Sequence, residues 1–455
     1  MAHFAAGLPQ FAGPIPAALP QLASLSGQAA GLVGQFAATA AKLAPKPDQK
    51  LDLVTPLVRR IINANYRLGA AAHAAALTAL ASSANIPEAL RAEAITDLGD
   101  WAKPSGRDNV TGLWRPLPKR DADLAKKALE PQLVELLRSP ATAVKLAVTK
   151  VSTKLGMKGG SASAFDLVAD KAQPGNVRVE ALRSLAVLKD AKLNDAVKLA
   201  QADADEGLRK EASKIQAQLK PGDATARLRT TLDTGTPGEK QSAFATLGTL
   251  NSTSADELLA QWVDKLLARQ VPPALQLDVI EAAAKRTAPV VKEKLTKFER
   301  SRDANDDLRA YRECLTGGDA AEGRKIFLEK QEVSCVRCHK AGGEGGEVGP
   351  ELTGIGSRQT REYLLDAIVY PNKQIAPGFE NLIVTLNNGT AYAGLLKGEN
   401  DTELELNSPE DGLMKLKKAD IKSRERGLSA MPEEFRQILT KRELRDLVEF
   451  LSTVK

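Results

Sequence analysis

The sequence lacks any long hydrophobic segment. No run of about 18 consecutive apolar residues occurs, so we expect no transmembrane helix. The first 41 residues contain no Lys or Arg, and prolines interrupt them at positions 9, 14, 16 and 20. A secretory signal peptide has a positive segment before an apolar one. The beginning of this sequence therefore does not predict a signal peptide.

Aromatic residues and cysteines are also scarce. Aromatics make up 4% of the residues although 43% are hydrophobic, and alanine is abundant, which favours close-packed helices over sheet. Three cysteines are too few for a disulfide-stapled fold. The net charge of +6 comes from 63 basic and 57 acidic residues that are mixed along the chain. No dense basic block stands out, so we expect no nucleic-acid partner.

Most of the chain predicts helices. Residues 1–50 are rich in Ala, Gly, Pro and Gln and are interpreted as an arm or linker, with one helix expected over 22–43. Residues 51–309 contain helical segments separated by short breaks, and a small residue recurs about every 31 positions, at Ala181, Ala212 and Ala243. This period predicts an α-solenoid of helix pairs, with an irregular helical bundle as the alternative.

One stretch interrupts this pattern. Residues 100–121 hold two tryptophans and several prolines, too many for a helix. We expect an ordered insertion that Trp101 and Trp114 pack onto the helices, with a ligand site as the alternative.

The last 145 or so residues predict a compact helical domain with a β insertion. Asp319 and Glu322 form a capping-box pattern at the start of one helix, and Thr440 and Glu443 form another at the start of the last helix. Between them, alternating apolar residues flank Asn388-Gly389 and then Asp411-Gly412, which predicts antiparallel hairpins over about 381–424. The predicted domains are therefore 1–50, 51–309 and 310–455.

The sequence Cys335-Val-Arg-Cys338-His339 is the attachment signature of c-type haem. Its two thiols can bond to the two haem vinyl groups, and the adjacent histidine can ligate the iron. A redox dithiol would be expected in a βαβ context, which is missing here. A zinc site could include Cys314, but the neighbouring Cys338 and His339 are difficult to direct at one tetrahedral ion. Cys314 itself is expected to be a buried or unpaired thiol.

The residues after the motif suggest how such a group would be held. A glycine-rich loop over 342–356 allows close approach of the backbone to a flat cofactor. A carbonyl near Pro350 is expected to accept the proton of the His339 nitrogen that faces away from iron. The only other histidines are His3 and His73. Met431 precedes Pro432 in an extended loop and is the favoured second ligand over Met414 or an open iron site.

These residues resemble the class I cytochrome c fold and, more narrowly, the Pirellula/Verrucomicrobium-type haem-binding domain. The resemblance rests on seven segments that cover about 315–455, namely GGDAAEGRKIF, CVRCHK, GGEVGPELTGIG, REYLLDAIVYPNKQIAPGFE, TLNNGTAYAGLL, SAMPEEF and LTKRELRDLVEFL. It implies that Cys335 and Cys338 attach haem, that His339 and Met431 ligate its iron, and that Gly323 packs against Phe450 where two helices cross. The sequence pattern V-R-x-E-A-L around Ala181 resembles HEAT-type repeats. The expected fold is thus mainly α, a HEAT-like α-solenoid followed by a class I cytochrome c domain with a small antiparallel β insertion.

We therefore expect a monohaem c-type cytochrome that transfers electrons. The resemblance implies a periplasmic or otherwise exported protein that accepts electrons from a sugar or alcohol dehydrogenase and passes them to a downstream acceptor, with the repeats as a docking scaffold. Members of this family usually carry a β-propeller dehydrogenase domain upstream, and no such domain is visible in this sequence, so a catalytic activity is not predicted. Two alternatives stay open: a haem-based sensor or peroxidase-like enzyme with an open iron site, and a binding scaffold with an accessory haem.

Overall fold

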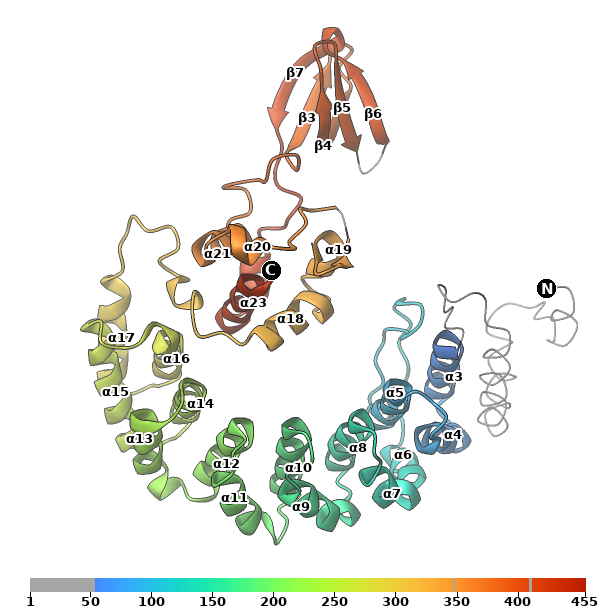
Figure 1. Ribbon diagram of the computed structural model, residues 1–455, viewed down its shortest axis with the longest axis vertical. Helices are drawn as coiled ribbons and strands as arrows, with labels where there is room; N and C mark the ends of the chain where they lie inside the picture. Colours follow the sequence, from blue (N-terminus) through green and yellow to red (C-terminus); the bar gives the residue numbers. More distant parts are fainter. Residues whose placement is uncertain (1–53, 347, 409–410) are drawn as a thin grey trace, which may run out of the picture. The chain divides into compact units, whose positions relative to one another are not determined.

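The computed structural model describes residues 54–346, 348–408 and 411–455 (Figure 1). The predicted arm over 1–50, with its helix over 22–43, lies outside the described residues. The protein is mainly helical with a small antiparallel sheet, as the sequence predicted, and it divides into two compact units after Ala224. Of the helices described, none has both the length and the apolar character needed to cross a bilayer.

The first unit consists of short helices that pack in sequence-adjacent pairs. Its α-helices are α3 (Val54–Leu68), α4 (Ala71–Ser82), α5 (Glu88–Gly99), α6 (Ala122–Leu129), α7 (Leu133–Leu137), α8 (Thr142–Lys154), α9 (Ser161–Ala169), α10 (Gly175–Val187), α11 (Leu193–Gln201) and α12 (Glu206–Leu219). Helix α10 packs against α9 and also against α12, the equivalent helix one pair later. The recurring Ala181 and Ala212 are fully buried in α10 and α12. A small residue there lets neighbouring helices approach closely, which explains why it recurs.

An arginine has the same structural role in two of the helix pairs: Arg178 stands three positions before Ala181 of α10, and Arg91 stands three positions before the buried Ala94 of α5. In α5, Arg91 donates to the carbonyl of Ala81 at the end of α4, and in α10, Arg178 donates to the carbonyl of Val168 at the end of α9. The last carbonyls of a helix have no partner within the helix and carry its negative dipole end. A buried guanidinium satisfies these carbonyls and joins the two helices of a pair.

The insertion over 100–121 is ordered, but its two tryptophans behave differently. Trp101 is fully buried against the first unit's core. Trp114, which was expected to pack in the same way, is 73% exposed, so this part of the prediction is wrong. Its ring instead covers Gly106, where a Cβ would lie 2.6 Å from the ring. Asp108 accepts hydrogen bonds from the backbone of Val110 and Thr111 within the insertion and from the side-chain amide of Asn63 on α3, which joins the insertion to the helices.

The second unit begins with further helices and ends with the motif-bearing part of the chain. Its first helices are α13 (Ala224–Thr234), α14 (Pro237–Leu247), α15 (Thr253–Leu267), α16 (Pro273–Ala284) and α17 (Pro289–Arg300). Ala243, the third recurring alanine, is buried in α14, which packs against α16. The remaining α-helices are α18 (Ala320–Glu329), α19 (Cys335–Cys338), α20 (Ile355–Arg358), α21 (Arg361–Val369), α22 (Phe435–Ile438) and α23 (Lys441–Thr453).

Helices α18 and α23 cross at a glycine. A Cβ on Gly323 would lie 1.9 Å from the carbonyl oxygen of Asp446 and 2.7 Å from Cβ of Phe450, which confirms the implied contact of Gly323 with Phe450. Asp319 caps α18 as predicted, since its carboxylate accepts from the backbone of Ala321 and Glu322. The Glu322 side chain does not complete the box, because it pairs with Lys325 and the N–H of Asp319 donates to Asp446 instead. Asp446 of α23 therefore takes part both in the crossing of the two helices and in the capping of α18.

The antiparallel sheet lies between α21 and α22 in the sequence. Its strands are β3 (Asn381–Leu386), β4 (Ala391–Glu399), β5 (Glu403–Ser408), β6 (Gly412–Lys417) and β7 (Ile421–Arg426), in the spatial order β6-β5-β4-β3-β7. The turns follow the glycine signals, since Gly389 has a φ of 87° and Gly412 a φ of 73°. One face carries a small core of Leu382, Val384, Leu404, Leu406 and Leu416.

Within the second unit, α16 and α23 are joined by a buried charge cluster. Asp278 of α16 is fully buried and lies 2.7 Å from Arg445 and 2.8 Å from Arg442, both on α23. The backbone also approaches closely beside it, since a Cβ on Gly317 would lie 2.5 Å from the carbonyl oxygen of Ala274. Helix α23 is thus joined by buried ion pairs to a helix that precedes it by more than a hundred residues.

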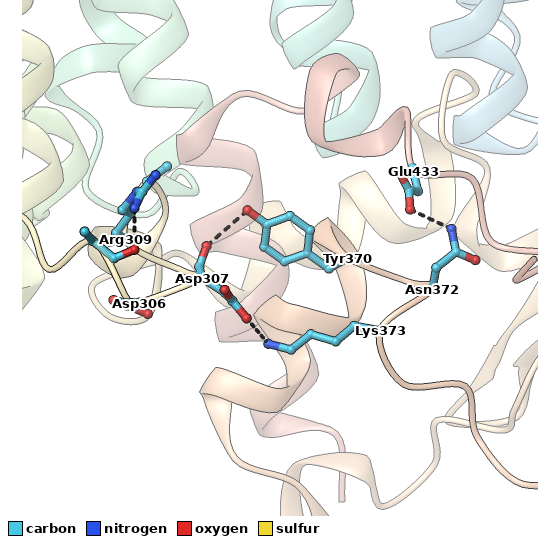
Figure 2. Close-up of a pocket in the computed structure, with 9 residues that line it drawn as sticks. Asp306, Asp307, Arg309, Tyr370, Asn372, Lys373 and Glu433 are labelled. Carbon is cyan, nitrogen blue, oxygen red and sulfur yellow. Dashed lines mark hydrogen bonds and ion pairs between the residues drawn. The ribbon is translucent and has the colours of Figure 1, made fainter.

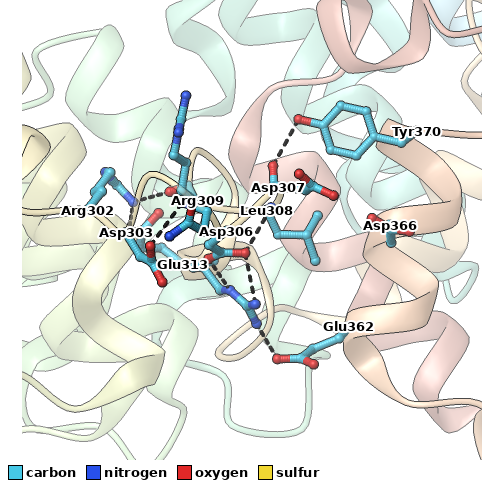
Figure 3. Close-up of polar contacts among 12 residues, drawn as sticks. Arg302, Asp303, Asp306, Asp307, Leu308, Arg309, Glu313, Glu362, Asp366 and Tyr370 are labelled. Carbon is cyan, nitrogen blue, oxygen red and sulfur yellow. Dashed lines mark hydrogen bonds and ion pairs between the residues drawn. The ribbon is translucent and has the colours of Figure 1, made fainter. Parts of the chain in front are cut away.

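The segment between α17 and α18 is held by ion pairs (Figure 3). Arg302 lies 2.6 Å from the buried carboxylate of Glu313, and Arg312 lies 2.6 Å from Asp306 and also contacts Glu362 of α21. The phenol of Tyr370 donates to the carbonyl of Asp307. These contacts anchor residues 301–315 to α21 and the residues that follow it.

Candidate haem-binding site

The Cys-x-x-Cys-His motif forms a single helical turn. Ser334 has a left-handed backbone conformation, with φ and ψ both 44°, and it ends the segment after α18. Helix α19 then spans Cys335–Cys338, and the N–H of His339 donates to the carbonyl of Cys335 at 2.9 Å. After this turn His339 is extended and leads into the short antiparallel pair β1 (Lys340–Ala341) and β2 (Glu344–Gly345). Two thiols and an imidazole are thus presented from one compact turn.

The glycine-rich loop folds back onto this turn. The N–H groups of Gly346 and Gly349 donate to the carbonyls of Val336 and Cys338 at 2.8 and 2.7 Å. A Cβ on Gly346 would lie 2.1 Å from the carbonyl oxygen of Arg337. On Gly349 it would lie 2.8 Å from Cε1 of the His339 ring. The close approach that the glycines allow is therefore made to the motif and its histidine, which packs the ring firmly in place.

His339 is oriented by the carbonyl of Pro350. The oxygen lies 2.9 Å from Nδ1, so the neutral ring carries its proton on Nδ1 and donates to it. Burial lowers the pKa of His339 and the Pro350 hydrogen bond opposes this, with burial dominating. A neutral imidazole with Nδ1 engaged leaves Nε2 as the nitrogen that can ligate a metal.

The two cysteines of the motif differ in exposure. Cys335 is half-buried, and burial raises the pKa of its thiol to about 11. Cys338 is exposed. Within the part of the chain that the structure describes, Cys335, Cys338 and Cys314 are free thiols, and no group of three or more His, Cys, Asp or Glu side chains is placed to hold a metal ion. The motif therefore does not gather its own residues around a single ion.

The motif lies at one wall of a largely apolar cavity of about 380 Å³. Its wall is built by the loop after the motif, by α20 and α21, by the segment leading to β3, and by the residues around Met431. The apolar side chains that line it include Phe327, Val333, Leu352, Ile355, Leu364, Ile368, Phe379, Leu395, Phe435, Leu439, Leu447 and Leu451. Among the lining residues are all five that the sequence suggested: Cys335, Cys338, His339, Pro350 and Met431.

Met431 lies in a loop of residues 427–434, between β7 and α22. It is partly buried against the same hydrophobic core as α18 and α23. Met414, the other methionine considered, packs against the core of the sheet, as its alternation with Leu416 predicted. Of the two, Met431 is the one that lines the cavity.

Several lining residues were not identified from the sequence. Leu395 lies on β4, on the face opposite Tyr392 and Leu396, which pack against the sheet core. Phe379 precedes β3, and Arg358 ends α20. The alternation of the strand is the signal that could have placed Leu395 on the face away from the sheet core, but no local pattern shows that this face meets the cavity.

The remaining candidate residues lie elsewhere. His73 is at the start of α4 in the first unit, where Nδ1 accepts from the N–H of Ala70. His3 is outside the described residues. Cys314 is fully buried, as expected, and burial raises the pKa of its thiol to about 12.

A second cavity, of about 670 Å³, lies beside the segment after α21 and is polar (Figure 2). Charged residues of both signs line it, among them Asp306, Asp307, Arg309, Lys373 and Glu433. Its cations are already engaged, since Lys373 pairs with Asp307 and Asp366, and Arg309 donates to the carbonyl of Ala304. The motif does not line this cavity.

The residues around the first cavity fit a covalently bound haem. The donor set comprises two thiols, an imidazole with Nδ1 hydrogen-bonded, and a thioether from a distant loop. These are the groups by which c-type haem is attached and ligated. The largely apolar wall suits a flat, mostly hydrophobic cofactor.

Comparisons with known proteins agree with this chemistry for part of the chain. Residues 320–394 match the family model described as cytochrome c. The matched segment contains Cys335, Cys338, His339 and Pro350 and ends before Met431. A search of curated proteins finds no match to the chain.

A solved structure that resembles the chain is the complex of CpcE and CpcF of phycocyanin lyase from Nostoc sp. PCC7120, with 15% identity and a TM-score of 0.33 over 65% of this chain and 98% of that chain. At this distance the likeness supports no functional argument. The cytochrome c match, in contrast, implies a covalently attached haem c with its iron, and it supports a haem-binding role in electron transfer for this part of the chain, with a redox partner and with export.

Proposed function

We propose that residues 310–455 form a monohaem c-type cytochrome domain that transfers single electrons. In this proposal Cys335 and Cys338 carry the haem, and His339 and Met431 are its axial ligands. One observation carries the proposal: a single apolar cavity is lined both by the Cys-x-x-Cys-His turn and by Met431, which lies roughly ninety residues later in the chain.

The protein residues have distinct tasks in this proposal. The Pro350 carbonyl orients His339 and fixes its tautomer, and Gly349 allows the ring to pack against the loop. Two neutral axial donors, an imidazole and a thioether, favour reduced iron relative to anionic ligands, and the apolar wall disfavours the added charge of the oxidised state. The bound haem supplies the reversible one-electron change at iron.

The axial assignment is tested by Met431→Ala, with Met414→Ala as the matched control. We expect Met431→Ala to remove the charge-transfer band between methionine sulfur and ferric iron, and Met414→Ala to retain it, because Met414 belongs to the sheet core. An unchanged band in Met431→Ala would overturn the assignment. If the parent protein itself lacks this band, the iron has an open site, which suits a haem-based sensor or a peroxidase-like enzyme.

We further propose that the domain is of the Pirellula/Verrucomicrobium type, that residues 51–309 are HEAT-like repeats, and that the protein acts in the periplasm. A sugar or alcohol dehydrogenase would be the electron donor, and the repeats would provide its docking surface. Support comes from the quoted sequence segments and from the repeated buried arginine and alanine of the helix pairs. Rapid-mixing reduction of the ferric protein by such a dehydrogenase tests the pairing, and a rate no faster than that of a mixture with an unrelated reductase would contradict it.

A further inference from the structure

The loop that carries Met431 has no regular secondary structure of its own. Residues 427–434 form neither helix nor strand, and they connect β7 to α22. A ligand on such a loop must be positioned by contacts from outside the loop, because a shift of about 1 Å is enough to spoil a binding geometry.

One side chain contacts this loop on both sides of Met431. The side-chain oxygen of Asn372 accepts a hydrogen bond from the N–H of Ser429 at 2.7 Å. Its amide nitrogen donates to the carboxylate of Glu433 at 2.6 Å, a contact visible in Figure 2. The hydroxyl of Ser429 in turn accepts from the N–H of Met431 at 3.1 Å. Asn372 therefore bridges the two flanks of Met431 with both of its polar atoms.

Asn372 is itself placed by the wall of the cavity. It follows Pro371, at the end of a segment that begins with α21, and both Pro371 and the α21 residues Leu364 and Ile368 line the cavity. Glu433 is also paired with Arg436 at 3.4 Å, and the Arg436 guanidinium lies 5.5 Å above the ring of Tyr370. The hold on the loop is thus anchored in the same helix that shapes the haem pocket.

We propose that Asn372 is a positioning residue that holds the Met431 loop so that the sulfur faces the iron. This inference rests on the proposed function, because it assumes that Met431 is a ligand. The hydrogen bond to the charged Glu433 carboxylate is of the stronger kind, and the bond from the Ser429 N–H adds to it. Removing both is expected to shift the equilibrium between methionine-bound and methionine-free iron on the order of 10-fold or more.

The test uses the full chain with haem attached and compares Asn372→Leu with Asn388→Ala. Asn388 is a matched control because its side chain accepts only within its own hairpin turn, from Thr390. We expect Asn372→Leu to weaken the sulfur-to-iron charge-transfer band, lower the midpoint potential and let the ferrous haem bind carbon monoxide. Unaltered values of all three would overturn the proposal.

A double variant that reverses the hydrogen bond between residues 372 and 433 tests whether the charge-transfer band can be restored. Asn372→Asp keeps the acceptor for Ser429 but faces the Glu433 carboxylate with a second negative charge. Adding Glu433→Gln supplies a donor in the opposite direction, so the double variant is expected to regain most of the band that Asn372→Asp loses. If the double variant is no better than Asn372→Asp, the bridging role of Asn372 is wrong.

Proteolysis separates this inference from the ligand assignment. Arg426 and Arg436 flank the loop and are trypsin sites. If the loop is released, cleavage there should be several-fold faster in Asn372→Leu than in Asn388→Ala. Should Met431→Ala leave the charge-transfer band intact, the ligand assignment has failed, and the cleavage rates alone then decide whether Asn372 holds the loop.

Discussion

Arg178 and Asp203 form a buried pair in the first unit, with side chains only 5% and 3% exposed. Two parallel hydrogen bonds join them, at 2.6 and 3.0 Å. The bond from Arg178, followed by one from the N–H of Asp205, lowers the pKa of Asp203 to about 2. Arg178 also donates to the carbonyl of Val168 at the end of α9. The Asp203 carboxylate therefore orients the guanidinium that satisfies this carbonyl.

This pair predicts a pH dependence. The carboxylate stabilises the fold above the ordinary pKa of 3.8, and this contribution is lost as the pH falls through the folded-state pKa of about 2. Asp203→Asn should therefore be less stable than the parent at pH 6, with a difference that shrinks from about pH 4 towards pH 2 when urea unfolding is followed by circular dichroism.

The control for this prediction is Asp195→Asn. Asp195 pairs with Lys198 at 3.8 Å, but both side chains are more than 70% exposed, so little effect is expected at any pH. A difference for Asp203→Asn that stays the same from pH 6 to pH 2 would contradict the argument.

At the residue scale, the sequence was most informative where the chemistry is local. The Cys-x-x-Cys-His spacing and the nearby Pro350 lie within one turn and loop, so their neighbourhood could be foreseen. Asn372 and Leu395 could not, because their roles depend on how separate segments meet. Trp114 was misjudged for another reason. An aromatic residue in a proline-rich loop predicts packing onto the helices, but the Trp114 ring covers Gly106 of the same insertion instead.

At the scale of elements, the crossing of α18 and α23 depends on the missing side chain of Gly323. Alanine usually stabilises a helix interior by about 1 kcal/mol relative to glycine. Here its Cβ would lie 1.9 Å from a backbone oxygen of α23, which cannot rotate away. We expect Gly323→Ala to destabilise the second unit by about 1–3 kcal/mol, measured by denaturant unfolding followed at the haem absorbance.

The matched substitution in the same unit is Gly398→Ala. A Cβ on Gly398 would lie 3.4 Å or more from the Glu405 side chain, which is an ordinary contact distance, so only a small change is expected. Equal stability of Gly323→Ala and the parent would show that the helices can separate without loss.

Elements were predicted well wherever their signals are local. The box of Thr440 and Glu443 forms at the start of α23, and the hairpin turns fall at the predicted glycines. The box at Asp319 is incomplete because a side chain from a distant helix, Asp446, reaches the backbone N–H that Glu322 was expected to satisfy. Capping patterns take no account of such competition from tertiary contacts.

At the scale of the whole molecule, the buried Asp278 joins helices that precede and follow the haem pocket segments. Removing its carboxylate leaves the guanidinium of Arg445, only 4% exposed, without a charged partner. Asp278→Ala is expected to destabilise the second unit by roughly 3–5 kcal/mol, seen as an earlier loss of haem absorbance in denaturant.

Glu281→Ala serves as the comparison, because Glu281 pairs with Arg442 at 2.5 Å but its side chain is 25% exposed. A smaller effect, of about 1 kcal/mol or less, is expected there. If the two variants lose stability equally, burial of the Asp278 cluster is not what stabilises this unit.

Architecture was the hardest scale to predict. The helical period, and the change of sequence pattern near residue 310, indicated a repeat region and a motif-bearing domain. The structure's compact units divide after Ala224, inside the repeat region, and the pairing of Asp278 with Arg445 lies within the second unit. Ion pairs between residues so far apart leave no periodic trace in a sequence, and the boundary near residue 310 stays a proposal.

The placement of the five-stranded sheet has a consequence for the order of assembly. Its two connections both line the haem cavity, one through Phe379 and the other through Met431, and Leu395 of the sheet lines it as well. The Cys335–His339 turn is local in sequence, whereas the walls contributed by Phe379, Leu395 and Met431 depend on non-local strand pairing. Because non-local contacts form more slowly than local ones, we expect the turn to form before the cavity is complete. We therefore expect thioether formation to precede the positioning of the Met431 loop.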